Sequence, residues 1–170
     1  MVAETHARTP KEVAEAALAS FAAHDADQVA ANAHPDCVEH FLPIGEFRGR
    51  TAIRDFYLEV FAAFPDFEVE VERIVADDRY AAVYWKARGT FSGAPFQGIA
   101  PNGRRAELLG TDAMEIQDGL IVRNTIYWDG AAFARDLGLL PPQGSRAERA
   151  MLAAFNVRTK VSLLLRRRRR

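Results

Sequence analysis

The chain has 170 residues, 49% of them hydrophobic and 26% charged, which is typical of a single soluble globular domain. Its single cysteine, Cys37, excludes an internal disulfide framework and a thiolate-rich metal cluster, and no apolar run approaches the length that spans a bilayer. The net charge of −1 is uneven: nine Lys and Arg against one Glu give residues 146–170 a charge of +8, which leaves residues 1–145 with −9, an acidic body that argues against a DNA-binding domain.

The first part of the chain predicts helices. Residues 1–20 have interspersed acids and no apolar core, so we expect no signal peptide and a cytoplasmic location. Within them, "TPKE" (9–12) has the form of a helix start, with a Thr cap, Pro at the first helical position and Glu three residues after the cap. A short helix is expected over residues 27–33, and "TAIRDFYLEVFAAF" (51–64) has apolar residues at helical spacing. Between these helices, "DCVEHFLP" (36–43) predicts a short strand.

The following residues change to the period of strands. "DFEVEVERIV" (66–75) alternates apolar with acidic residues, and residues 80–91 alternate in the same way. Two further strands are expected over residues 105–116 and 120–128, joined by the tight-turn sequence Asp118-Gly119. Helices followed by long antiparallel strands predict an α+β domain.

The C-terminal part predicts one more helix. Residues 145–148 (SRAE) form a capping box, and an apolar stripe follows on about a third of the helical wheel, so we expect this helix to dock on another surface. The expected division is a domain over 1–142, this amphipathic helix over 143–165 and a basic tail over 166–170. Such a tail is most often a solvated end, and attraction to an anionic membrane or to nucleic acid is the weaker alternative.

Three stretches in order resemble the SnoaL-like polyketide cyclases of the NTF2-like superfamily. They are "EFRGRTAIRDFYLEVFAAFPD" (46–66), "RGTFSGAPFQGIAPNGRRAELLGTDAMEIQDGLIV" (88–122) and "WDGAAFARDLGLLP" (128–141). The resemblance implies an NTF2-like cone, in which helices wrap a curved antiparallel sheet around one deep pocket. It also implies a homodimer through the outer face of the sheet, and a hydrophobic small molecule as substrate.

Asp129 is the first candidate catalytic residue, because the resemblance places it where the family has a general acid/base. It would take a proton from a carbon acid of a polyketide-like substrate, whose enolate closes a ring by an intramolecular aldol reaction without metal or cofactor. A carboxylate suits this role only if a dry, apolar wall raises its proton affinity. The alternative is a helix N-cap, since Asp129 directly precedes a short amphipathic helix.

Asp112 is the second candidate. Its strand neighbours on the same face are apolar or small, namely Leu108, Gly110, Met114 and Ile116. A carboxyl in such a row is paired, neutral or directed into a cavity. The resemblance extends to ketosteroid isomerases, where a similar stretch carries a protonated aspartic acid that donates to the substrate oxyanion. The alternative is an ion pair with Arg88, Arg105 or Arg123.

His40 is the third candidate, because "CVEHF" (37–41) resembles the segment that carries the base of ketosteroid isomerases, although they have Asp where this chain has His. Their oxyanion tyrosine would fall near Leu18, which cannot donate, so steroid isomerisation is disfavoured. Epoxide hydrolysis is weaker still, since the aspartate it needs corresponds to Ile126. A histidine that titrates near neutrality still suits a pocket base or a hydrogen-bonding group.

Six side chains are predicted to bind the substrate: Trp85, Phe61, Phe91, Tyr57, Met114 and Tyr127. The histidines show no spacing that would build a zinc site, so no metal is expected. Isomerisation, dehydration and epoxide opening remain alternatives for the same pocket. A non-catalytic module that binds a ligand or partner is the alternative from another class, and in it Asp129 would only cap a helix and Asp112 would be ion-paired.

Overall fold

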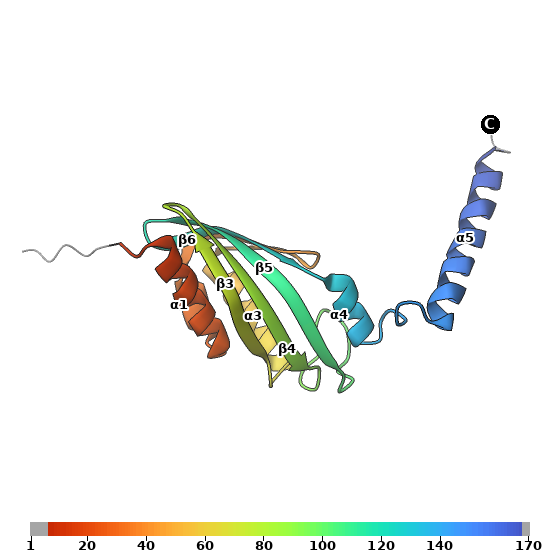
Figure 1. Cartoon of the computed structure of the whole chain (residues 1–170), viewed down its shortest axis with the longest axis horizontal. Helices are drawn as coiled ribbons and strands as arrows, with labels where there is room; N and C mark the ends of the chain where they lie inside the picture. The colour runs from red at the N-terminus through yellow and green to blue at the C-terminus, as the bar shows by residue number, and fades with distance from the viewer. Residues whose placement is uncertain (1–6, 168–170) are drawn as a thin grey trace, which may run out of the picture.

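The computed structural model describes residues 7–167, and Figure 1 shows their arrangement. The helices are α1 (Pro10–Ala22), α2 (Ala26–Ala31), α3 (Gly49–Ala63), α4 (Gly130–Asp136) and α5 (Arg146–Arg167). The strands are β1 (Ala33–Phe41), β2 (Gly45–Arg48), β3 (Glu68–Ala76), β4 (Tyr80–Thr90), β5 (Arg105–Gln117) and β6 (Leu120–Trp128). The predicted α+β class is confirmed.

One six-stranded sheet has the order β2-β1-β6-β5-β4-β3. Neighbouring strands are antiparallel with one exception: β1 and β6 pair in parallel. The β1–β6 pair thus departs from the antiparallel pattern that the resemblance implies and that the rest of the sheet follows. Tight turns fix the direction of β5 and β6, whereas β1 reaches β6 from far away in sequence and no hairpin determines its direction.

The sheet is curved, and α1 and α3 cover its concave side (Figure 1). Strand alternation decides which side chains face these helices, as β4 shows: Val83 and Trp85 are buried, while Tyr84 and Lys86 between and beyond them are exposed. The core is therefore a layer between the concave sheet face and the helices, and the functional cavity lies within this layer.

Local signals at the helix ends are confirmed. The Thr9 side chain accepts a hydrogen bond from the backbone N–H of Glu12, whose carboxylate in turn accepts from the Thr9 N–H at 2.7 Å, so the predicted capping box opens α1. The predicted strand over 36–43 begins three residues earlier, at Ala33, and the short edge strand β2 was not expected.

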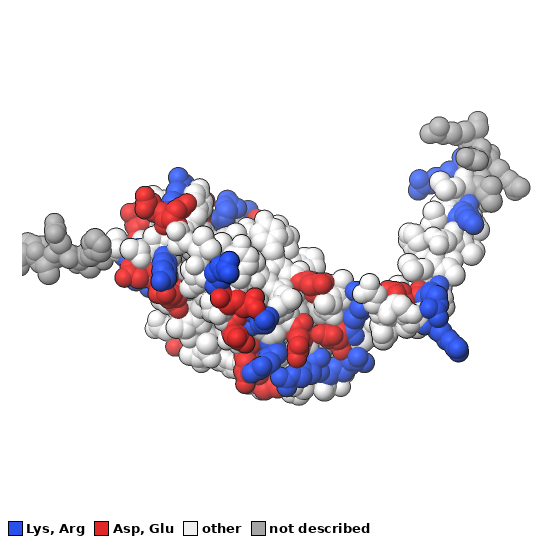
Figure 2. Space-filling view, viewed as in Figure 1, with Lys and Arg blue, Asp and Glu red and all other residues white. Residues whose placement is uncertain are grey.

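The predicted docking of the C-terminal helix is not found among the described residues of the chain. Helix α5 projects from the body (Figure 1), and its large apolar side chains, Met151, Leu152, Phe155, Val157, Val161, Leu163 and Leu165, are exposed. Figure 2 shows acids and bases intermixed over the body, whereas α5 carries no acid after Glu148 in its first turn.

Among residues 7–167, no helix has both the length and the hydropathy needed to cross a bilayer. The last three residues of the basic tail lie outside the described residues.

Candidate active site

A cavity of about 100 Å³ lies between the concave face of the sheet and helices α1 and α3. Because one ordered water needs roughly 10–15 Å³, this space holds several waters or part of a small organic molecule. Its lining is mainly aromatic and aliphatic, with a few polar groups. A mostly apolar cavity with few convergent polar groups is the usual form of a small-molecule site.

Glu39 is the most buried carboxyl group in this cavity, with 5% of its surface exposed. It lies on β1 in phase with Cys37 and Phe41, and all three line the cavity. Burial raises the pKa of Glu39 to about 7, with a further increase from the negative charge of Asp112, while hydrogen bonds from Tyr57 and Asn124 act in the opposite direction.

Asp112 on β5 is the second acid of the cavity, as the sequence predicts. Burial raises its pKa to about 6, and hydrogen bonds from Trp85 and Asn124 limit this increase. The alternative of an ion pair is not realised in the described chain, since Arg88 pairs with Glu68 and Asp112 accepts from two uncharged groups.

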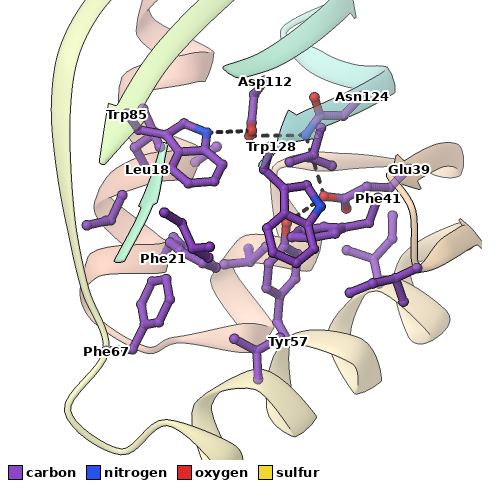
Figure 3. A pocket seen from close by; sticks show the side chains of 18 of the residues that line it. Leu18, Phe21, Glu39, Phe41, Tyr57, Phe67, Trp85, Asp112, Asn124 and Trp128 are labelled. Atoms are coloured by element: carbon purple, nitrogen blue, oxygen red, sulfur yellow. Dashed lines mark hydrogen bonds between the residues drawn. The ribbon is translucent and has the colours of Figure 1, made fainter. Parts of the chain in front are cut away.

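Hydrogen bonds join these two carboxyl groups into one chain of side chains (Figure 3). Trp85 donates its indole N–H to Asp112 Oδ1 at 2.8 Å. The Asn124 amide donates to Asp112 Oδ2 at 3.3 Å and to Glu39 Oε1 at 3.4 Å, and the Tyr57 hydroxyl donates to the same Oε1 at 2.5 Å. The register explains this geometry, because Glu39 and Asn124 are paired positions on β1 and β6. No described group donates to Glu39 Oε2, which leaves that oxygen available to a ligand.

The structure places Asp129 outside the cavity. Its exposed carboxylate accepts from the backbone N–H groups of Ala131 at 3.1 Å and Ala132 at 2.9 Å, and so caps α4. Trp128, one residue earlier, lines the cavity, so strand alternation directs Asp129 to the other face. The cap interpretation is observed, and a catalytic role for Asp129 stays a prediction.

His40 also faces away from the cavity, for the same reason: it follows the inward-facing Glu39 on β1. Of the six predicted substrate-binding residues, Tyr57, Trp85 and Met114 line the cavity. The other three do not, since Phe61 stacks on His24 with ring centroids 4.7 Å apart, Phe91 is fully buried against Phe64, and Tyr127 is 54% exposed. These placements give His40 and Tyr127 no contact with a ligand in the cavity.

Glu39 and Asn124 line the cavity although the sequence did not predict them as site residues. A signal for Glu39 was present, because strand alternation puts it in phase with the apolar Cys37 and Phe41. The resemblance directed attention to His40 instead, one residue along, and a shift of one residue selects the opposite face. Cys37 is a buried thiol, and burial raises its pKa to about 12, so it stays protonated at neutral pH.

A family comparison matches residues 11–137 to the model described as SnoaL-like polyketide cyclase. Among solved structures, IdmH from Streptomyces antibioticus, a proposed polyketide cyclase, is 26% identical with a TM-score of 0.65, over 77% of this chain and 99% of IdmH. AclR from Streptomyces galilaeus, a proposed hydroxylase, is 22% identical with a TM-score of 0.68, over 78% of this chain and 97% of AclR.

A third solved structure, from Catenulispora acidiphila, is described as having a ketosteroid isomerase-like fold. It is 15% identical with a TM-score of 0.64, over 77% of this chain and 95% of that one. No curated protein sequence matches this chain at a significant level. The matched family segment ends before α5 and includes every residue of the cavity described above.

Proposed function

Because this chain belongs to the SnoaL-like polyketide cyclase family, we propose that it catalyses an intramolecular aldol ring closure of a polyketide-like or other bulky apolar substrate. The observation that carries this proposal is a buried carboxyl group, Glu39, with a pKa near 7 and one free oxygen in an apolar cavity. A general base works best when its pKa lies near the operating pH.

The proposed reaction begins when Glu39 Oε2 removes a proton from a carbon next to a substrate carbonyl. The electron pair of that C–H bond forms the enolate, whose carbon attacks a second carbonyl of the same molecule. A C–C bond forms, and the second carbonyl oxygen becomes an alkoxide. The protonated Glu39 then returns its proton to this alkoxide, so the product is an isomer of the substrate and needs no oxidant, reductant or co-reactant.

Asp112 and Tyr57 support Glu39 in this proposal. The charge of Asp112 raises the pKa of Glu39, and the Tyr57 hydroxyl fixes Oε1 so that Oε2 is the reacting oxygen. Asp112 is itself an acid with a pKa raised to about 6, which suits a second group that protonates or polarises an oxygen. The proposal thus gives Glu39 the proton transfer that the family resemblance implies for Asp129.

The experiment uses 1-(2-naphthyl)hexane-1,5-dione, an aromatic diketone that an aldol reaction closes to a six-membered ring. Proton NMR in D₂O follows exchange of the hydrogens next to the carbonyls, and mass spectrometry identifies the product. Replacing Glu39 with Gln keeps the shape and removes the base, so we expect exchange and ring closure to fall by roughly 100-fold or more. Glu70→Gln, on the exposed part of β3, is the matched control.

Other results of the diketone experiment would favour a different catalytic residue, a different reaction or a protein without catalytic activity. Loss of turnover in Asp129→Asn with full activity in Glu39→Gln would contradict the assignment, since Asn caps a helix about as well as Asp. A product lighter by one water indicates dehydration after closure, and a product with a moved double bond indicates isomerisation. Binding of the diketone without exchange in the wild-type protein would favour the non-catalytic module.

A further inference from the structure

Two residues that line the cavity each have a buried polar atom with no hydrogen-bond partner in the described chain. The two atoms are the indole nitrogen of Trp128, a donor, and Oδ1 of Asn124, an acceptor. The large majority of buried side-chain polar atoms in proteins are paired, and an unpaired one destabilises the folded state. Two such atoms on residues of one cavity therefore call for partners that enter it from outside.

The orientation of the Asn124 amide follows from its surroundings. Its nitrogen lies between two carboxyl oxygens, of Glu39 and Asp112, and an amide nitrogen has two hydrogens to donate. Both hydrogens are thus used, and the amide oxygen is left to accept. Asn124 is 5% exposed, so bulk water does not reach it freely.

Trp128 is fixed by aromatic packing and not by a hydrogen bond. Its ring makes edge contacts with Phe41 and Phe133, with centroids 5.7 and 5.1 Å apart. Figure 3 shows the indole reaching across the pocket from the end of β6. Trp85, the other cavity tryptophan, differs because its N–H already donates to Asp112.

We infer that Trp128 and Asn124 determine the substrate class: an apolar ring compound that carries a carbonyl oxygen for the Trp128 N–H and a hydroxyl group for Asn124 Oδ1. Both residues lie on one face of β6, four positions apart, which corresponds to about 13 Å between their backbones. This inference deepens the proposed function and rests on it for the reaction, but not for binding.

The test uses three naphthalenes that differ by one group. 6-Hydroxy-2-acetonaphthone carries both polar groups, 6-hydroxy-2-isopropenylnaphthalene replaces the carbonyl oxygen with CH₂, and 6-methyl-2-acetonaphthone replaces the hydroxyl with methyl. Calorimetry gives each Kd. In the wild-type protein we expect each replacement to weaken binding about five- to tenfold, since one buried hydrogen bond is lost and a protein atom stays unpaired.

Two variants assign the groups. Trp128→Phe keeps an aromatic ring without the N–H, so the carbonyl preference should disappear while the hydroxyl preference remains. Asn124→Ala should remove only the hydroxyl preference. Asn124 also holds the carboxyl groups, so this variant is evaluated by the ratio of two ligands within the same protein, which cancels any general loss of affinity. Circular dichroism confirms folding.

The result that overturns the inference is an equal Kd for the three ligands in the wild-type protein, which would mean that retained water satisfies both atoms. A carbonyl preference that survives in Trp128→Phe overturns the assignment of that residue. These measurements need no turnover. If the ligand preferences hold but Glu39→Gln exchanges protons normally, the proposed reaction is wrong and the binding inference stands. If the three ligands bind equally but Glu39→Gln loses proton exchange, the proposed reaction stands and the binding inference is wrong.

Discussion

Glu39 and Tyr57 form the closest pair in the cavity, and the pair makes the proton affinity of the base dependent on one hydroxyl group. The Tyr57 hydrogen bond stabilises the charged carboxylate and so lowers its pKa against the effect of burial. Burial in turn raises the pKa of Tyr57 itself well above its usual value, so the phenol stays protonated and continues to donate.

Replacing Tyr57 with Phe should raise the pKa of Glu39 further. At neutral pH a smaller fraction of the base is then ionised, so the proton-exchange rate falls near pH 7 and recovers at higher pH. The measurement is the pH–rate profile of exchange, supported by carbon NMR of the Glu39 carboxyl. A profile with an unchanged midpoint would contradict the proposed role of Tyr57.

The raised pKa of Glu39 also links stability to pH. Between the ordinary value of 4.5 and about 7, the unfolded chain has lost the proton that the folded chain still holds, so the free energy of unfolding decreases as pH rises through this window. The difference is on the order of 3 kcal/mol for Glu39 alone. Asp112 acts in the same direction between 3.8 and about 6.

Urea unfolding at pH 5 and pH 8 measures this effect. We expect the wild-type protein to be less stable at pH 8 by a difference that Glu39→Gln reduces, because the amide cannot titrate. The variant keeps an oxygen that accepts from Tyr57 and Asn124. An equal loss of stability in the variant would show that Glu39 is ionised in the folded state throughout this range.

At the scale of single residues, the sequence identified Asp112 and missed Glu39, for opposite reasons. Asp112 stands out as an acid within a long row of apolar residues, and alternation along β5 is regular over the relevant positions. Glu39 lies on β1 next to His40, a residue with familiar chemistry, and the sequence signal for that strand covered only residues 36–43. Asn124 gave no signal, because an amide between two carboxyl groups is recognisable only once the strands are paired.

The elements were predicted more completely than the site, because their signals are local. The bounds of β6 agree with the expected range, and those of α3 and β4 differ from expectation by one or two residues at an end. The parallel pairing of β1 with β6 was missed, since it depends on contacts between segments more than 80 residues apart. The same long-range pairing forms the cavity, so the residues of the site could not all be predicted from local sequence patterns either.

Strand β5 contains a glycine that the site requires. A Cβ atom added at Gly110 would lie 2.3 Å from the Trp85 ring, well inside van der Waals contact. Gly110 thus permits the indole to lie close to β5 and donate to Asp112, two residues along the same strand.

Gly110→Ala should therefore displace Trp85 and destabilise the protein by about 1–3 kcal/mol, the usual range for overpacking. Loss of the Trp85 hydrogen bond should also raise the pKa of Asp112. Tryptophan fluorescence measures the displacement of Trp85, and thermal unfolding measures the loss of stability. Gly45→Ala, where an added Cβ meets nothing within 4 Å, is the matched control and should leave both unchanged. Equal behaviour of the two variants would contradict this role of Gly110.

On the scale of the whole molecule, the outer face of the sheet carries an uncharged row. Tyr84 and Tyr127 flank Thr111 on adjacent strands, and the neighbouring Leu109 is 59% exposed. Exposed apolar groups in one row mark interaction sites, and a row without charge can face its own copy across a two-fold axis. We therefore expect a homodimer through this face.

Sedimentation at micromolar concentration tests the expected dimer. Leu109→Lys should shift the protein to a monomer, because the two symmetry-related lysines place like charges in the contact. Leu139→Lys, at a site that is 50% exposed in the segment between α4 and α5, is the control. A dimer that survives Leu109→Lys would point to another contact, and the exposed apolar side chains of α5 are then the next surface to substitute.

The hydrogen-bonded chain from Trp85 to Tyr57 has a consequence for how the protein changes over evolution. Its five members come from five different elements: β4, β5, β6, β1 and α3. A shift in the position of any of these elements would alter the hydrogen bonds of the chain and with them the pKa of Glu39. The packing of the fold and the acidity of the base therefore depend on the same residues. Adaptation to a new substrate is thereby directed to the apolar wall, where side chains can change size without disturbing proton transfer.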